Sequence, residues 1–138
     1  MKGNDMTWAR AQLQRYYELL DDGKLSEAVG LFDSEGEVLW SIPGRGEMAG
    51  KYETIPAILD SLERFHSGKY GVVDRPVHAI CAAPDGEHAC VQYLLRMKRG
   101  EEVCRVVAID AWHVRDSGLA EAWTFFETPY QFDEWTSR

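Results

Sequence analysis

The spacing of apolar residues changes once along this chain, near Gly68, and this change limits the possible folds more than any other feature. Before Gly68, apolar residues recur three and four positions apart, which matches the turn of an α-helix. After Gly68 they alternate with polar residues, as in a β-strand with one face against a core. Helices followed by a run of strands predict an α+β fold with the helices on one face of the sheet.

Three helices are predicted in the first part of the chain. Gly23 ends the first helix, since glycine readily adopts the conformation found after a helix C-terminus. Thr54 is suited to cap the third helix, and Pro56 is tolerated because it falls in the first turn. The predicted order is a helix at residues 7–22, a helix at 25–32, a strand at 38–42, a loop at 43–51 and a helix at 55–67.

The second part is predicted to form an antiparallel meander, because turn sequences recur at regular intervals. The turns at residues 84–86, 99–100 and 116–118 separate strands at 77–82, 89–98, 103–114 and 119–127, with a further short piece at 70–74. The C-terminal end carries Tyr130, Phe132 and Trp135. Such an aromatic segment is predicted to dock onto the body of the domain.

Composition narrows the classes of partner. The 138 residues carry a formal net charge of -8, and we expect one domain over residues 1–138. No cluster of Lys and Arg offsets this charge, so nucleic acid is not expected to bind.

No apolar run is long enough to span a bilayer and no secretory signal is evident, so a cytoplasmic protein without membrane contact is expected. Three cysteines lack CxxC spacing and four histidines are scattered, so neither a metal nor a cofactor is expected.

Asp110 is the sharpest local anomaly in the sequence. It falls on one face of the strand at 103–114, in a row whose other members are Cys104, Val106, Ala108, Trp112 and Val114. A carboxyl group in such a row must be hydrogen-bonded, paired or protonated, because burying its uncompensated charge is expensive. This residue is therefore the first candidate for acid and base chemistry.

The neighbouring strands supply the other residues of a predicted pocket. Trp123 and Phe125 share one face of the strand at 119–127 and are expected beside Trp112. Gln92 shares a face with Leu94 in the strand before. The predicted pocket lining consists of Trp40, Gln92, Leu94, Ala108, Trp112, Trp123, Phe125 and Glu127.

Both faces of the predicted sheet carry apolar rows, and helices can cover only one of them. The other face would leave a larger apolar patch than soluble monomers usually expose. We therefore expect a homodimer through this second face.

Two segments resemble the ketosteroid isomerase and SnoaL-like polyketide cyclase group of the NTF2-like superfamily. The first is residues 15–23 with the helix that follows and the Pro43-Gly44 turn, and the second is the strand-turn-strand unit at 109–123. The resemblance extends over almost the whole chain. It implies a cone-shaped fold with three N-terminal helices packed on a curved antiparallel sheet that encloses a pocket for an apolar small molecule.

The resemblance also implies roles for particular residues. Tyr16 and Asp110 match the two hydrogen-bond donors of the isomerase oxyanion hole, and Tyr17 lies on the same helical stripe and could replace Tyr16. The proton-shuttling aspartate of those isomerases is absent, because the first strand ends in Trp40-Ser41. A true steroid isomerase is therefore disfavoured. Glu127 and His88 are weaker candidates for a second proton-transfer group.

These observations predict a pocket protein that moves a proton next to a carbonyl, as a cofactor-independent isomerase, cyclase or lyase acting on an apolar polyketide-like or aromatic substrate. One alternative is a binding or sensing module for a hydrophobic metabolite, and another is a dimerising scaffold without a cavity. The loop at residues 43–50 is either a mobile lid, with Met48 over the pocket, or a simple surface crossover.

Overall fold

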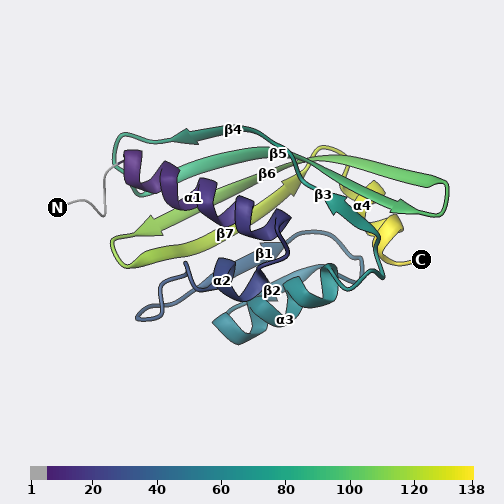
Figure 1. Ribbon diagram of the computed structural model, residues 1–138, viewed down its shortest axis with the longest axis horizontal. Coiled ribbons are helices and arrows are strands. Elements are labelled where there is room, and N and C mark those ends of the chain that lie inside the picture. The colour runs from purple at the N-terminus through teal and green to yellow at the C-terminus, as the bar shows by residue number, and fades with distance from the viewer. Residues whose placement is uncertain (1–5) are drawn as a thin grey trace.

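A curved sheet and a layer of helices make up the structure, a computed structural model that describes residues 6–138. In Figure 1, α1 lies along the sheet, α2 and α3 follow beside it, and α4 lies near the C-terminus. The elements are, in order, α1 (Met6–Asp21), α2 (Leu25–Val29), β1 (Leu39–Ile42), β2 (Gly50–Tyr52), α3 (Ile55–Phe65), β3 (Val72–Asp74), β4 (Val77–Ala82), β5 (His88–Arg99), β6 (Glu102–Arg115), β7 (Gly118–Phe126) and α4 (Pro129–Thr136).

The helices of the first part form where periodicity placed them, with one change in length. The Thr54 hydroxyl accepts a hydrogen bond from the Ala57 N–H at 3.1 Å, which caps α3 as predicted. α2 ends at Val29 rather than near residue 32. The chain leaves the helix there because the Asp33 N–H binds the Leu119 carbonyl at 2.8 Å, beside β7.

The sheet is mixed rather than wholly antiparallel. Its order is β2-β1-β7-β6-β5-β3, and β4 pairs with β5 beside β3. β1 runs parallel to β7, whereas the other pairs are antiparallel. β2 lies at the end of the segment predicted as loop, and it pairs with β1. The meander of the second half is confirmed.

A one-residue irregularity in the β6–β7 hairpin reverses the predicted faces of β7. Val114 pairs with Leu119, but His113 pairs with Glu121, so the register shifts between these positions. Without the shift, Asp110 would lie opposite Trp123, as the prediction required. With it, Asp110 pairs with Thr124. A slip of one residue turns every later side chain to the other face.

The C-terminal segment docks by means of a fourth helix, α4, which the sequence analysis did not identify as helical. Phe132 and Trp135 are buried, and the Trp135 indole N–H donates to the Tyr70 carbonyl at 2.8 Å. Tyr130 remains exposed. The helices of residues 6–138 include none long and apolar enough to cross a membrane.

Candidate functional site

Asp110 lies at the centre of a buried polar cluster between the sheet and α1. Its side chain is 4% exposed, and three hydroxyl groups donate hydrogen bonds to it. Thr124 donates at 2.8 Å and Tyr93 at 3.1 Å, both to Oδ1, while Tyr17 donates to Oδ2. The donors come from β7, β5 and α1, so the site exists only when these three elements pack together.

Two tryptophans hold the donors in place. The Trp112 indole N–H donates to the Tyr17 hydroxyl at 2.9 Å, and the Trp40 indole N–H donates to the Thr124 hydroxyl at 3.3 Å. Both indoles were predicted as pocket lining and lie on the same face of the sheet as Asp110. Their N–H groups orient the hydroxyls, which is the usual way a buried polar network becomes rigid.

Burial raises the pKa of the Asp110 carboxyl, and the hydrogen bonds from Tyr17, Thr124 and Tyr93 partly offset that rise. Burial also raises the pKa of the Tyr17 and Tyr93 phenols well above the ordinary value. Asp110 therefore retains its proton to a higher pH than an exposed aspartic acid. A carboxyl group of this kind can both give and take a proton.

Tyr16, the predicted partner of Asp110, takes a different position. It is buried edge-on against Tyr17 and Trp112, with ring centroids 5.1 and 5.2 Å apart. Among the described residues no group bonds its hydroxyl, whereas every fully buried side-chain nitrogen or oxygen has a partner. The Tyr16 hydroxyl must therefore touch a space at least the size of a water molecule. Tyr17 bonds Asp110, and Tyr16 is left as an open donor beside it.

Of the other predicted lining residues, Ala108 is buried on the Asp110 face, but five lie on the opposite face. The pairing of Tyr93 with Ala108 and of Thr124 with Asp110 turns the alternate residues outward. Trp123 is 37% exposed and Phe125 is 55% exposed. The residues that the prediction assigned to the wrong face are Gln92, Leu94, Trp123, Phe125 and Glu127.

His88, a weaker candidate for proton transfer, also lies away from the cluster. It is exposed on the outer face, where its ring stacks on that of His113 at 5.3 Å and its Nδ1 lies 2.9 Å from Asp85. It makes no contact with Asp110. No group of three or more His, Cys, Asp or Glu side chains suited to a metal ion occurs within residues 6–138.

Sequence reasoning missed Tyr93 and Thr124. Tyr93 alternates with the apolar residues Val91, Leu95 and Met97, and its hydroxyl was the only sign of a polar role. Thr124 alternates with Ala122 and Phe126 on the face that was thought to point outward. The Asp110–Thr124 pair would have been visible only from the register.

A hollow of about 320 Å³ lies between α1 and β4, and it reaches the buried cluster through Tyr17. It is lined by Gln14, Tyr17, Glu18, Asp21, Val77 and Ile80. Tyr17 thus forms part of the hollow's wall while its hydroxyl bonds Asp110.

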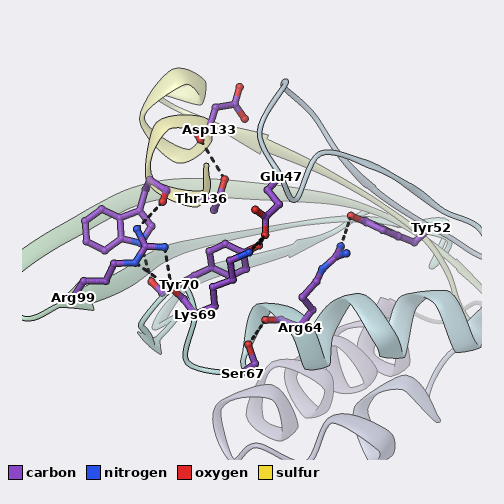
Figure 2. Close-up of polar contacts among 10 residues, drawn as sticks. Glu47, Tyr52, Arg64, Ser67, Lys69, Tyr70, Arg99, Asp133 and Thr136 are labelled. Carbon is purple, nitrogen blue, oxygen red and sulfur yellow. Dashed lines mark hydrogen bonds and ion pairs between the residues drawn. The ribbon is translucent and has the colours of Figure 1, made fainter. Parts of the chain in front are cut away.

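The loop between β1 and β2 makes several hydrogen bonds to the body of the domain, and Figure 2 shows those of Glu47 with Lys69 and Tyr70. Asp133 accepts hydrogen bonds from the Arg45 N–H at 2.9 Å and the Gly46 N–H at 3.1 Å. The Glu47 carboxylate accepts from Lys69 and Tyr70. Met48, in the same loop, is fully buried. In this structure the loop is therefore closed over the core.

The comparisons with known proteins identify the fold. Bal32a, from a soil-derived mobile gene cassette, superposes with a TM-score of 0.83 at 20% identity, over 94% of this chain and 96% of that one. An NTF2-like protein from Burkholderia xenovorans gives a TM-score of 0.74 at 14% identity, over 97% and 99% of the two chains. SalBIII, an epoxide hydrolase/cyclase-like enzyme in pyran ring formation in the polyether salinomycin, gives 0.73 at 14% identity, over 91% and 95%.

The chain therefore has the NTF2-like fold, as the resemblance in its sequence implied. A protein from Xanthomonas campestris proposed to be a polyketide cyclase shares this fold, with a TM-score of 0.71 and 13% identity over 94% of this chain and 96% of that one. No family model matches the sequence. No curated protein matches it either. Identities this low establish the fold and leave the reaction to be argued from the site.

Proposed function

We propose that the buried cluster transfers a proton next to the carbonyl of an apolar, polyketide-like or aromatic compound, as a cofactor-independent isomerase or cyclase. The observation that carries the proposal is Asp110, a carboxyl group buried in the core and held by three hydroxyls from three elements. Two proteins of the same fold, one an epoxide hydrolase/cyclase-like enzyme and one proposed to be a polyketide cyclase, add weight by analogy.

In the proposed reaction Asp110 takes a proton from the carbon next to the carbonyl and returns it at another position. The three hydroxyl donors occupy three of the four lone-pair positions of the carboxylate, so one remains for the substrate. The Tyr16 hydroxyl, which has no partner among the described residues, donates to the oxygen on which negative charge develops. Fixed donors in a water-poor site stabilise such an enolate strongly.

The test is exchange of the acidic C–H protons of a neutral ketone in deuterium oxide, followed by NMR with 2-tetralone as the first probe and polyketide-like diketones afterwards. Asp110→Asn should reduce exchange by about a hundredfold or more, since a positioned acid or base contributes on this order. Tyr16→Phe should reduce it by about a hundredfold, the usual effect of one oxyanion donor. Tyr130→Phe, at an exposed tyrosine, is the matched control. Unchanged rates in the first two variants would remove both assignments.

A binding or sensing module is the second candidate. Two observations favour it: Trp40-Ser41 replaces the acid expected at the end of β1, and the Asp110 carboxyl is bonded by protein donors on both oxygens. In this case Asp110 orients a ligand without reacting. Tight binding measured by calorimetry, with no product after prolonged incubation, would support this function over catalysis.

We further propose that a second copy of this chain covers the outer face of the sheet. Ile109 and Phe125 pair across β6 and β7 there, and Trp123 and Val103 are exposed on the same face. Ile109, Phe125 and Trp123 are neighbours in the sheet and form an exposed apolar surface, and a twofold dimer covers such a surface with its own copy.

A further inference from the structure

Arg75 is a buried cation at the junction of β3 and β4. It is 5% exposed, and no other Arg or Lys among residues 6–138 is buried to this degree. Sequence reasoning did not select it, because it stands outside the alternating rows and directly before Pro76. A buried guanidinium normally has a carboxylate beside it, since charge without a counter-ion is costly to remove from water.

The hydrogen-bond partner of the Arg75 side chain is a neutral histidine. Its Nη2 lies 2.5 Å from Nε2 of His66, and the other ring nitrogen, Nδ1, lies 2.8 Å from the Leu62 carbonyl. Nδ1 must carry the hydrogen that this carbonyl accepts, which leaves Nε2 as the acceptor for Arg75. Burial and the nearby charge of Arg75 lower the pKa of His66 to about 4. His66 therefore supports the guanidinium but does not neutralise it.

No carboxylate among the described residues pairs with this cation. Asp21 accepts a hydrogen bond at 3.3 Å from the backbone N–H of Arg75, not from its side chain. The ring of Phe65 lies 5.8 Å from the guanidinium carbon and contributes only a weak cation–π contact. The charge of Arg75 lowers the pKa of Asp21 against a larger rise due to burial, so this carboxyl lies nearby, but it makes no hydrogen bond to the guanidinium.

The nitrogens of Arg75 that have no partner face an accessible space. Every fully buried side-chain nitrogen and oxygen of the described residues has a hydrogen-bond partner, whereas Nε and Nη1 have none. They must therefore touch space that a water molecule can reach. Nη2 carries two hydrogens, and His66 takes one of them. The second Nη2 hydrogen stays available beside either Nε–H or Nη1–H. The guanidinium therefore keeps one pair of adjacent N–H donors that can bind two oxygens at once.

Arg75 lies near the Asp110 cluster, because Val77, two residues further along the chain, pairs with Tyr93 in the sheet. The charge of Arg75 lowers the pKa of Tyr16, Tyr93 and Asp110, in each case against a larger rise due to burial, so it acts on all three from nearby. The Tyr16 hydroxyl is likewise a donor without a protein partner. Two unsatisfied donor groups, one of them charged, thus occur close to one acid.

We propose that Arg75, positioned by His66, is an anion-binding group that holds the carboxylate of an apolar carboxylic acid in this interior, with Tyr16 as a further donor. The pair of adjacent N–H donors on the guanidinium matches the two oxygens of a carboxylate. The inference rests on the proposed interior site, and it adds that the natural ligand carries a carboxylate as well as a carbonyl. It requires binding only, not turnover.

The test compares two probes of the same shape, 2-naphthoate and 2-naphthamide, by calorimetry and by ligand-observed NMR on the full chain. The wild-type protein should bind the acid at least about tenfold more tightly than the amide, since hydrogen bonds to charged groups carry that much discrimination. Arg75→Gln should abolish the preference and Arg75→Lys should reduce it. Arg105→Gln removes the same charge at an exposed position on the outer face and should leave the preference unchanged.

The wild-type comparison remains decisive even if Arg75→Gln fails to fold. Equal binding of acid and amide, or no binding of the acid, would overturn the proposal, as would a preference that survives in folded Arg75→Gln. A third measurement follows the Nε–H signal of Arg75 by NMR as 2-naphthoate is added, and it should shift. Selective binding without exchange of 2-tetralone protons would retain this site and reject the proposed reaction. Exchange of 2-tetralone protons without a preference for the acid over the amide would support the proposed reaction and reject the carboxylate site.

Discussion

Both faces of the sheet carry apolar side chains, but the two faces differ in what their polar groups can do. On the inner face Asp110 is buried against α1 and accepts hydrogen bonds from three hydroxyl donors. On the outer face Glu121 and His113 lie in partial contact with solvent, with a carboxylate oxygen of Glu121 4.0 Å from Nδ1 of His113. Water screens the electrostatic interaction between the two outer groups and weakens it. The inner groups interact more strongly, because the buried interior has a low dielectric constant. Burial, rather than residue type, makes the inner face the candidate for chemistry.

The largest effect on stability is expected when Asp110, the centre of the inner cluster, is replaced. Asp110→Ala leaves the hydroxyls of Tyr17, Tyr93 and Thr124 without their acceptor, and we expect a loss of about 4 kcal/mol in the free energy of unfolding, since each unsatisfied buried donor costs about 1–3 kcal/mol. Urea unfolding measures it. Arg105→Ala, on the outer face of the same strand, should change stability by about 0.5 kcal/mol or less. Similar losses in the two variants would remove the contrast between the faces.

The second prediction compares an inner and an outer histidine. The pKa of His66 is about 4 in the folded state and 6.5 for an ordinary histidine, so the folded state binds the proton less tightly. Its contribution to stability is therefore complete above pH 6.5 and is lost as the pH falls toward 4, by about 3 kcal/mol in total. His66→Gln should remove this part of the pH dependence of unfolding.

His113→Gln is the matched control for that measurement, because His113 is half-exposed on the outer face near Glu87 and Glu121. Its stability profile should follow that of the wild type between pH 4 and 6.5. If His66→Gln and the wild type lose stability equally over this range, His66 is not the buried neutral base that supports Arg75.

The smallest expected effect concerns association across the outer face. Phe125→Glu places a charge in the proposed dimer surface and should weaken association by about a hundredfold, which corresponds to about 2.7 kcal/mol. Sedimentation equilibrium measures it. Tyr130→Glu, at an exposed aromatic outside the sheet, should leave the dimer intact. A wild-type chain that is monomeric at high concentration would contradict the proposal directly.

Much of the fold could be predicted because its signals are local. The α1 and α3 patterns, the Thr54 cap and the turns of the meander each depend on residues close in sequence. β2 escaped prediction because three residues carry too little periodicity, and it is ordered by pairing with β1. α4 was recognised as a docking segment but not as a helix, since its helical pattern is short and mixed with polar residues.

The residues of the candidate site also fall into two groups: some could be identified from local sequence patterns, and others only from the folded structure. Asp110 was identifiable because strand alternation placed it alone among apolar residues. Tyr16 and Tyr17 are neighbours on the buried side of α1, and no sequence pattern decides which of them reaches the acid. Arg75 escaped notice because the burial of a charged residue depends on what packs over it. His66 and Arg75 are nine positions apart, and the folded chain brings their side chains together.

The sequence by itself determined the order of helices and strands, the α+β class and the presence of one acid in an apolar row, because these follow from periodicity within single elements. The tertiary structure decided which residues surround that acid. A register shift of one residue between His113 and Val114 brought Thr124 to Asp110 and turned Trp123 and Phe125 away. Such a shift arises from the pairing of whole strands and their packing under α1, so it lies outside the information in any single segment.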